Sequence, residues 1–381
     1  MTKVLQIDNY MYPHIGGIEQ VTRDILNSIK GEYEERVLCF NHEKGTITDQ
    51  VDGVDVTRVS CQAKVASQSI ALSYGKVLKK IMNEFEPDIV IFHYPNPFVA
   101  HYLMKYLKNK KFKFIIWWHL DIVKQKILGK LFKGQTLKLL KYADKVVATS
   151  PNYIEGSQWL LPNKDKCIVI PNCISESRLK YDDNHIAKAN EIKNKYNGKT
   201  ILFGFGRHIE YKGLTYLVKA SKLLDDNYIV LIGGSGPLTD SLKEEAKDDN
   251  KVEFLGRISD DDLKSYLLAC DIFCFPSITK NEAFGIGLAE AMYYSKPVIT
   301  FSIPGSGVNY VSIKDETGLE VENSNPEKYA EAIKYLSKNK ELMEKFAINS
   351  KKRVDELFLE SKFKTSILSL LNEVSKWKKL Q

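Results

Sequence analysis

Two glutamates eight residues apart follow an apolar segment in the C-terminal half of the chain. The phrase is Pro276-Ser-Ile-Thr-Lys-Asn-Glu282-Ala-Phe-Gly285-Ile-Gly-Leu-Ala-Glu290. We expect a strand to end at Phe275, Glu282 to lie in the next loop, and a helix to begin near Gly285. The dipole and free N–H groups of a helix start favour a phosphate, and carboxylates can bind sugar and ribose hydroxyls. A glutamate near a helix start is also an ordinary stabilising choice, so only the whole phrase, and neither glutamate alone, indicates a binding site.

Two cations and several glycines precede this phrase. Gly206-Arg207-His-Ile-Glu-Tyr-Lys212 follows one expected strand, and Gly233-Gly-Ser-Gly236 follows the next. An arginine and a lysine at the carboxyl edge of a sheet suit a diphosphate without a metal. The alternative explanation is plain surface charge. The third glycine of a dinucleotide-binding fingerprint is missing here.

The N-terminal half carries weaker signals of the same kind. Gly16 and Gly17 open an expected helix after the first strand, where backbone N–H groups can meet an anion, although such glycines also occur for backbone reasons alone. His14 lies just before them. His93 and His119 each follow an expected strand, although a single histidine is more often structural than catalytic.

Short β-rich segments alternate with helical patterns along the chain, which indicates parallel sheets covered on both faces. Expected strands of the first half are 4–8, 36–40, 88–92, 114–117, 145–148 and 167–170, with helices at 18–29 and 71–85 among those between them. The pattern restarts with expected strands at 200–204, 228–232, 252–255, 271–275 and 296–300, and a helix over about 361–376 ends the chain.

These patterns predict an α/β protein with two Rossmann-like domains facing each other across a cleft. We place the first domain at 1–174 and the second at 175–358, and expect a C-terminal helix in 359–381 to return to the first domain. The 381 residues are too many for one compact core, and the apolar share of 44% is ordinary for a folded enzyme.

The composition excludes several classes of protein. No apolar run approaches the roughly 18 residues of a membrane-spanning helix, and the first residues do not resemble a signal peptide. The six cysteines form no CxxC pair and lie in apolar runs, so we expect buried thiols rather than disulfides or a zinc ribbon. No cluster has metal-ligand spacing.

Positive charge is concentrated in one window. Residues 105–141 hold eleven lysines and one acid, Asp121, so this window carries a charge of +10. The whole chain carries +7, so the other residues together are negative. Aromatic residues are interleaved with the lysines, among them Trp117, Trp118 and Phe132. A solvated face is the simple explanation, and an anionic membrane surface or a nucleic acid are the functional ones.

The phrase from Glu282 to Glu290, the Arg207 and Lys212 segment before it, and Gly16-Gly17 at the front resemble the retaining GT-B glycosyltransferases of family 4. The resemblance covers nearly the whole chain in the family's order. The phrases Tyr12-Pro-His-Ile-Gly-Gly, His93-Tyr-Pro-Asn-Pro-Phe98 and His119-Leu-Asp-Ile look most like bacterial O-antigen mannosyltransferases.

The resemblance implies a role for each matching position. His119, Arg207, Lys212 and Glu282 would be catalytic, with His119 on the donor sugar, the two cations on the diphosphate and Glu282 on the sugar hydroxyls. Glu290 would hold the ribose. The remaining donor-binding positions would be Gly16, Gly17, Gly206, Gly236, Arg257, Ile258, Phe284, Gly285, Ile286, Gly287 and Leu288. His14 and His93 would lie on the acceptor side.

The segment Ile303-Pro-Gly-Ser-Gly-Val-Asn309 departs from the family, because it lacks the glutamate of the usual Gly-Gly-x-x-Glu phrase. That puts the family's pyrophosphate loop in doubt. The resemblance otherwise implies transfer of a hexose, favoured as mannose from GDP-mannose, by same-face attack and without a cofactor or metal. The acceptor would be a saccharide, expected to be lipid-linked, in O-antigen or capsule synthesis.

Other interpretations stay open from the sequence alone. A UDP-hexose donor fits the same phosphate and ribose motifs. A nicotinamide-dependent oxidoreductase with two Rossmann domains is less well supported, because neither glycine turn has the full fingerprint. Nucleic-acid binding rests only on the lysine window, and we expect none. We expect a cytoplasmic enzyme held on the inner face of the membrane by residues 105–141.

Overall fold

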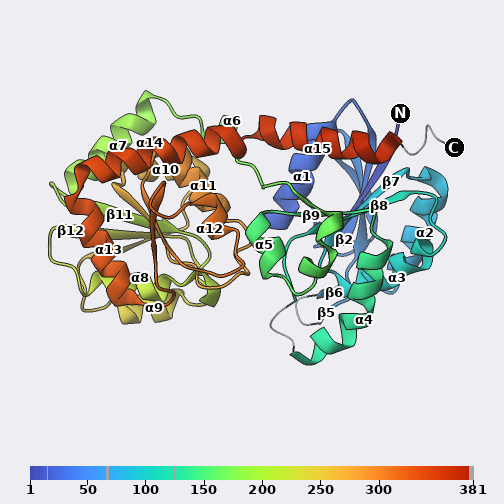
Figure 1. Ribbon diagram of the computed structural model, residues 1–381, viewed down its shortest axis with the longest axis horizontal. Coiled ribbons are helices and arrows are strands. Elements are labelled where there is room, and N and C mark those ends of the chain that lie inside the picture. The colour runs from blue at the N-terminus through green and yellow to red at the C-terminus, as the bar shows by residue number, and fades with distance from the viewer. Residues whose placement is uncertain (15, 66–67, 123–125, 377–381) are drawn as a thin grey trace. The chain divides into compact units, whose positions relative to one another are not determined.

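The computed structural model describes residues 1–14, 16–65, 68–122 and 126–376. The chain forms two compact units, one made of Met1–Asn172 with Glu360–Gln381 and the other of Cys173–Leu359 (Figure 1). The domain boundaries expected from the sequence lie within two residues of these divisions.

The sheet of unit 1 has eight strands in the order β10-β9-β8-β7-β1-β2-β4-β3. All neighbours in it are parallel except β3, which is antiparallel to β4. The strands of this unit, with a separate β5–β6 hairpin, are β1 Lys3–Ile7, β2 Glu34–Asn41, β3 Ile47–Val51, β4 Val54–Ser60, β5 Ala63–Val65, β6 Gln68–Ile70, β7 Ile89–Tyr94, β8 Lys113–Trp118, β9 Lys145–Ala148 and β10 Cys167–Val169.

Helices cover both faces of this sheet (Figure 1). They are α1 Gly17–Ile29, α2 Tyr74–Phe85, α3 Pro97–Leu107, α4 Lys126–Tyr142, α5 Pro151–Gly156, the 3₁₀ helix η1 Leu161–Lys166, and α15 Glu360–Ser375. Local sequence explains where some of them begin. The Asn96 side chain accepts a hydrogen bond from Val99 N, and Pro97 occupies the first turn of α3, where no N–H is needed.

The C-terminal helix α15 packs with unit 1. It contacts α1, Asn372 accepts a hydrogen bond from the Tyr33 hydroxyl at 3.0 Å, and the Phe363 ring lies 6.0 Å from that of Trp117. The chain therefore leaves the first unit at residue 172 and re-enters it at residue 360.

Unit 2 is a second parallel sheet, of six strands in the order β13-β12-β11-β14-β15-β16. The strands are β11 Thr200–Phe205, β12 Tyr228–Gly233, β13 Val252–Gly256, β14 Ile272–Phe275, β15 Val298–Phe301 and β16 Gly318–Val321. Helices again cover both faces (Figure 1): α6 Glu176–Leu179, α7 Asp183–Lys195, η2 Glu210–Lys212, α8 Leu214–Ser221, α9 Thr239–Glu245, α10 Asp260–Ala269, α11 Ile286–Tyr293, α12 Val308–Val311, α13 Pro326–Lys338 and α14 Lys340–Leu357.

The sequence patterns located eleven of these strands, and the structure confirms each of them to within two residues at either end. They missed β3, β4 and the short β5, β6 and β16. The β3–β4 hairpin turns at Asp52-Gly53, where both residues have positive φ, at 52° and 85°. An Asp-Gly pair at this position is a hairpin signal. The all-parallel prediction for the first sheet is wrong at β3, because a two-residue turn can join only antiparallel strands.

All six cysteines are free thiols, and Cys61 and Cys167 are half-buried rather than buried as predicted. Within the described ranges, no helix is both long enough and apolar enough to cross a membrane.

Candidate functional site

The sheet of unit 2 changes direction between β11 and β14. The chain runs from β11 outward through β12 to β13, and from β14 outward through β15 to β16. Ligands of open α/β sheets bind outside the carboxyl ends of the strands at this kind of switch point. The loop after β11 carries Arg207 and Lys212, and the loop after β14 carries Glu282.

Lys212 and Glu282 meet at this edge. The Lys212 Nζ lies 2.5 Å from the Glu282 Oε2, and the Ser277 hydroxyl donates to the same oxygen at 3.2 Å. The ammonium also lies 5.2 Å from the centre of the Phe275 ring. Burial lowers the pKa of Lys212, but the Glu282 carboxylate outweighs it and leaves the pKa above its ordinary value. The site therefore keeps a permanent cation.

The backbone around the pair is shaped by glycine. Gly285 has a φ of 93° and ends the loop directly before α11, and Gly206 has a φ of 151° beside the Lys212 side chain. Other residues rarely adopt these conformations. No side chain caps the start of α11. Its first N–H groups are therefore available to an anionic ligand.

The segment that departs from the family, 303–309, packs under this loop. The Ser306 hydroxyl donates to the Glu282 carbonyl at 2.5 Å. A Cβ atom at Gly307 would lie 2.0 Å from the Ala283 carbonyl oxygen. The segment thus supports the backbone that carries Glu282, without a carboxylate of its own.

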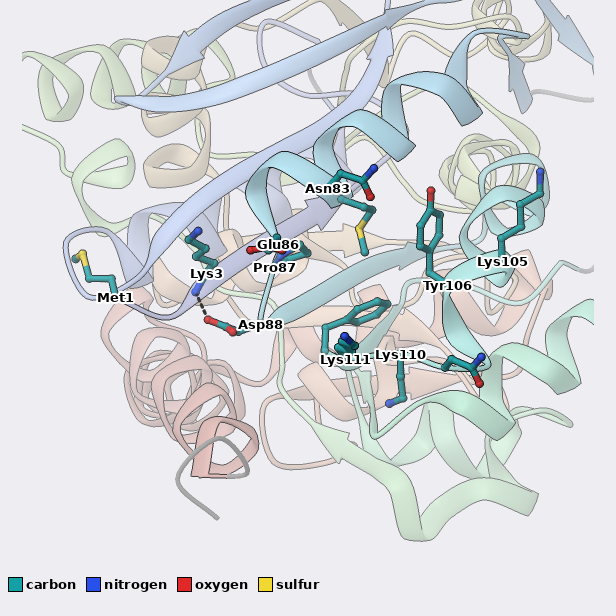
Figure 2. Close-up of a pocket in the computed structure, with 13 residues that line it drawn as sticks. Met1, Lys3, Asn83, Glu86, Pro87, Asp88, Lys105, Tyr106, Lys110 and Lys111 are labelled. Carbon is teal, nitrogen blue, oxygen red and sulfur yellow. Dashed lines mark hydrogen bonds between the residues drawn. The ribbon is translucent and has the colours of Figure 1, made fainter. Parts of the chain in front are cut away.

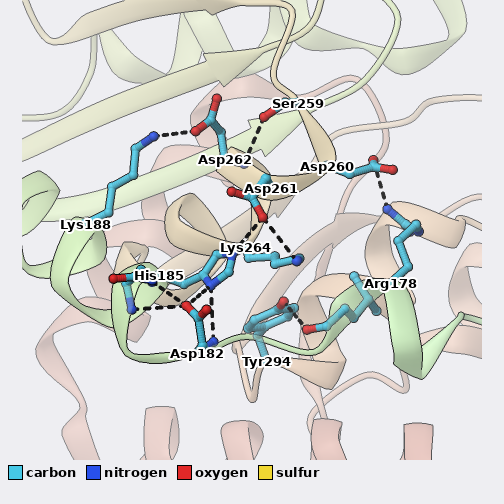
Figure 3. Close-up of polar contacts among 12 residues, drawn as sticks. Arg178, Asp182, His185, Lys188, Ser259, Asp260, Asp261, Asp262, Lys264 and Tyr294 are labelled. Atoms are coloured by element: carbon cyan, nitrogen blue, oxygen red, sulfur yellow. Dashed lines mark hydrogen bonds and ion pairs between the residues drawn. The ribbon is translucent and has the colours of Figure 1, made fainter.

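Glu290 lies in α11 and its residue is 4% exposed. Arg178 in α6 forms an ion pair with the Glu290 Oε1 and a second with Asp260, at 3.1 Å, at the start of α10. Figure 3 shows Arg178 directed at Asp260, beside the chain segment that leads to Asp182. The family resemblance implies that Glu290 holds the ribose, and the sequence did not predict this cation beside it.

The same network ties α7 to the first turn of α10 (Figure 3). Ser259 caps α10, and the three aspartates after it pair with cations outside that turn. His185 Nε2 lies 2.9 Å from Asp261, and Lys188 pairs with Asp262. The pKa of His185 is raised, first by its hydrogen bond to Asp261, against the effect of its burial. These exposed pairs stabilise little individually.

The other sequence-predicted positions in unit 2 differ in accessibility. Arg207 and Arg257 are exposed, and Ile258 packs against Gly233. Gly236 lies against the His208 backbone. Phe284 and Leu288 have buried side chains, so only their backbone groups could touch a ligand. Ile286 and Gly287 are half-buried in the first turn of α11.

The sheet of unit 1 has its own switch point, between β1 and β7. His93 is the penultimate residue of β7 rather than lying after it, and His119 directly follows β8. Their rings are nearly parallel, at 14°, and His93 Nδ1 lies 2.9 Å from His119 Nε2. The His93 ring also contacts the Gln6 amide oxygen and the Thr22 hydroxyl, and these four side chains form a polar cluster.

Burial sets the protonation of this cluster. It lowers the pKa of His119 to about 3 and, together with the neighbouring His119, holds the pKa of His93 well below its ordinary value. Asp8 accepts a hydrogen bond from Thr22, yet burial and the charge of Glu19 raise its pKa to about 8. The cluster is neutral at pH 7.

The residues expected near the start of α1 lie close to its first turn. Gly16 is the residue before α1, which no side chain caps, and Gly17 is its exposed first residue. His14 is exposed and lies 3.7 Å from Glu19. Glu19 adds negative charge at this helix start, where the sequence predicted room for a diphosphate.

Both halves of the chain match known glycosyltransferase families. Residues 15–178 match the model described as Glycosyltransferase Family 4, and residues 186–353 match Glycosyl transferases group 1. A D-rhamnosyltransferase of Pseudomonas aeruginosa is 31% identical over 92% of this chain and 90% of its own. The chain is a family 4 glycosyltransferase.

Two further similarities agree with this family. O-antigen chain mannosyltransferase C of Escherichia coli is 29% identical to this glycosyltransferase over 93% of the chain and 94% of its own length. The crystal structure of Anabaena HepE in complex with UDP has a TM-score of 0.79 with 17% identity, covering 98% of this chain and 100% of that one. The fold is GT-B, as the sequence indicated.

A cavity of about 540 Å³ lies elsewhere in the glycosyltransferase (Figure 2). Its lining includes Met1, Lys3, Asp88 and Phe112, which lie at the amino ends of β1, β7 and β8. This is the opposite edge of the sheet from His93 and His119. Lys105, Lys110 and Lys111 of the basic window also line it.

The aromatic residues of the basic window belong mainly to the core. Trp117 is 1% exposed and Trp118 is 0% exposed, so neither side chain is available to a membrane interface. Both lie on the central strand β8, which is covered on both faces. Phe132 is half-buried. Lys110 and Lys113 pair with Asp144, whereas the lysines exposed in the window are Lys105, Lys108, Lys111, Lys133, Lys138 and Lys141.

Four positions of the glycosyltransferase site were missed by the sequence. Ser277 and Ser306 hold Glu282, Arg178 pairs with Glu290, and Gln6 bonds to His93. Ser277 could have been found, because it lies at the carboxyl end of β14. The other contacts join segments far apart in the chain. Among the described residues, no group of three or more His, Cys, Asp or Glu side chains could hold a metal ion.

Proposed function

We propose that this glycosyltransferase transfers a hexose from a nucleotide-sugar to a saccharide acceptor with retention of configuration. The observation that carries the proposal is the buried Lys212–Glu282 pair at the switch point of unit 2, beside the uncapped start of α11. A fixed cation and a helix start suit a diphosphate, and a carboxylate beside them suits sugar hydroxyls.

The proposed roles are those that the family resemblance implies for these positions. Lys212 and Arg207 bind the diphosphate and stabilise the charge that grows on it as it leaves. Glu282 binds the sugar hydroxyls, and Glu290 the ribose. His119 binds the donor sugar from unit 1, and His14 and His93 lie on the acceptor side. The acceptor oxygen attacks the face from which the diphosphate leaves, and the departing phosphate takes its proton. Cations and helix N–H groups then suffice without a metal.

The favoured donor is GDP-mannose. The support is the similarity to a D-rhamnosyltransferase and to an O-antigen mannosyltransferase along most of the chain. A UDP-hexose is the second candidate, because the similar fold of HepE holds UDP. The O-antigen chain named for the relative supports a saccharide acceptor, which we propose is lipid-linked.

Thermal shift measurements with GDP, UDP, NAD and a short oligonucleotide test the class and the base together. A ligand that binds only the folded state increases the free energy of unfolding, by about 2.7 kcal/mol at a ligand concentration of 100 Kd, and so raises the melting temperature. We expect GDP alone to stabilise the protein. Stabilisation by UDP alone would select the second donor. Stabilisation by NAD alone would contradict a glycosyltransferase donor site.

We further propose that the exposed lysines of the basic window hold the enzyme on an anionic membrane at the cytoplasmic face. Each lysine near an anionic leaflet contributes about 1 kcal/mol. The sequence also offers Lys124, Lys126 and Lys130 for membrane contact. Lys124 and the side chains of Lys126 and Lys130 lie outside the described residues. Replacing Lys133, Lys138 and Lys141 with Glu should abolish low-salt co-sedimentation with anionic vesicles. Unchanged sedimentation would leave these lysines as a solvated face.

A further inference from the structure

A chain of hydrogen bonds in unit 1 leads from the α1 backbone to His119. The Gln6 Nε2 donates to the Thr22 carbonyl at 3.3 Å, and the Gln6 Oε1 lies 3.0 Å from His93 Nε2. His93 Nδ1 in turn lies 2.9 Å from His119 Nε2. Each contact restricts which atom of the next side chain carries a proton.

The direction of the chain is set at its inner end. A backbone carbonyl can only accept hydrogen bonds, so the NH₂ group of Gln6 must face Thr22 and its oxygen must face His93. That oxygen also can only accept. The proton of His93 therefore lies on Nε2. The Thr22 hydroxyl oxygen lies 3.3 Å from the same nitrogen and can also accept from Nε2–H.

The second histidine follows from the first. A neutral imidazole carries a single N–H, and burial keeps both rings neutral. His93 Nδ1 then has a lone pair and must receive the proton of His119 Nε2. The His119 Nδ1 is left unprotonated. Among the described residues no hydrogen-bond partner of Nδ1 is found, and His119 is 6% exposed at the carboxyl edge of β8.

We propose that Gln6 and His93 are positioning residues that fix His119 as the tautomer whose Nδ1 accepts a hydrogen bond from a sugar hydroxyl of the substrate. The inference rests on the proposed role of His119. It goes further by naming the accepting atom and by giving His93 a task in orienting His119, in addition to any contact with the acceptor.

The test reads the tautomer directly. Histidine-selective ¹⁵N labelling and long-range ¹H–¹⁵N spectra distinguish a protonated from an unprotonated ring nitrogen, and the His119 signals are assigned by their loss in His119→Phe. We expect an unprotonated Nδ1 and a protonated Nε2 at pH 7 in the wild-type protein. A protonated Nδ1 would overturn the proposal, whatever the activity.

Two variants at position 93 form a matched pair. His93→Phe keeps the ring shape but removes the acceptor, so His119 should populate both tautomers. His93→Asn places a carbonyl oxygen where Nδ1 was, so it should restore the wild-type tautomer. The double variant Gln6→Met/Thr22→Val removes both acceptors of the His93 Nε2–H, so both histidines should populate both tautomers. A wild-type tautomer of His119 in both His93→Phe and this double variant would show that these residues do not control it.

Activity separates the inference from the function on which it rests. The loss of one neutral hydrogen bond corresponds to roughly 2- to 12-fold. His93→Phe should lower kcat/KM for transfer by about this factor with GDP affinity unchanged, and His93→Asn should recover it. Wild-type kcat/KM in both His93→Phe and His119→Phe would contradict a role in substrate binding. Failure of the proposed function appears differently, as no transfer and no nucleotide binding by the wild-type protein.

Discussion

The polar groups at the two switch points differ in charge. In unit 2, Lys212 pairs with Glu282 and Arg178 pairs with Glu290, so the carboxyl edge is built from buried or half-buried ions. In unit 1, His93 and His119 are neutral and burial raises the pKa of Asp8 to about 8. Ions suit a diphosphate, and neutral groups suit sugar hydroxyls. The two units have the same kind of parallel sheet, but the residues at its carboxyl edge suit a diphosphate in unit 2 and sugar hydroxyls in unit 1.

The largest effect is expected at the ionic site. Lys212→Ala should lower kcat by about 10²- to 10³-fold, because the cation acts on charge that grows in the transition state. Steady-state transfer kinetics measure it. The exposed Lys222, which pairs with Glu245 on the surface, offers a control whose replacement by Ala should leave kcat unchanged.

The double variant Lys212→Ala/Glu282→Gln separates catalysis from structure. Lys212→Ala alone leaves the Glu282 carboxylate without its cation, which destabilises the fold. If the lysine only neutralised Glu282, the double variant should have the same kcat as Glu282→Gln alone. Our account predicts a kcat well below that of Glu282→Gln, while thermal stability recovers relative to Lys212→Ala.

The second prediction concerns the ribose. Glu290→Ala should weaken nucleoside diphosphate binding by about 1.5–3 kcal/mol, because a charged acceptor is lost. Calorimetric titration with GDP measures it. Arg178→Ala is the matched variant, since it breaks the same ion pair and keeps the carboxylate. Equal losses in both variants would mean that Glu290 acts only as the partner of Arg178.

The third prediction tests whether the Asp8 carboxyl of unit 1 is uncharged at neutral pH. Folding raises the pKa of Asp8 from 3.8 to about 8, so the folded chain holds a proton that the unfolded chain lacks between these pH values. The free energy of unfolding should therefore fall as pH rises across this window. Relative to Asp8→Asn, the wild-type protein should lose at least about 1 kcal/mol between pH 5 and pH 8 in urea titrations.

Glu35 is the internal control for this comparison. Burial raises its pKa to about 8 as well, so it contributes the same pH slope to wild type and to Asp8→Asn. Glu35→Gln should reduce the slope without changing transfer. Identical pH profiles for wild type and Asp8→Asn would place a charged carboxylate at Asp8.

The smallest effect is expected at Ser277. Its hydroxyl donates to the Glu282 carboxylate, which already has Lys212 as a partner. Ser277→Ala should cost about 0.5–1.5 kcal/mol in kcat/KM, measured at low donor concentration. Ser277→Thr keeps the hydroxyl and should restore most of it. A loss as large as that of Lys212→Ala would mean that Ser277 itself touches the reacting groups.

The fold was more predictable from sequence than the site. Apolar segments such as 228–232 and 298–301 are buried on both faces, and this burial produces a continuous β-rich pattern. The edge strand β3 is largely exposed and short, so it has no such pattern. The loop glycines and Glu282 could be proposed as site residues because several chemical signals lie within a few residues.

The partners of the site residues were less predictable. Arg178 lies 112 residues before Glu290, and Gln6 lies 87 residues before His93. Nothing in the local pattern of either residue differs from that of an ordinary helix or strand. The strand at 114–117 was predicted, but no local pattern gives its place in the sheet, where β8 is the third of eight strands.

Hydrogen–deuterium exchange with and without GDP tests the central claim most directly, because it locates the bound diphosphate. The account predicts slower exchange in the segments 206–213, 234–237 and 282–290 of unit 2, at the carboxyl edge of β11, β12 and β14. Protection confined to residues 83–88 and 105–112, around the cavity of Figure 2, would contradict it.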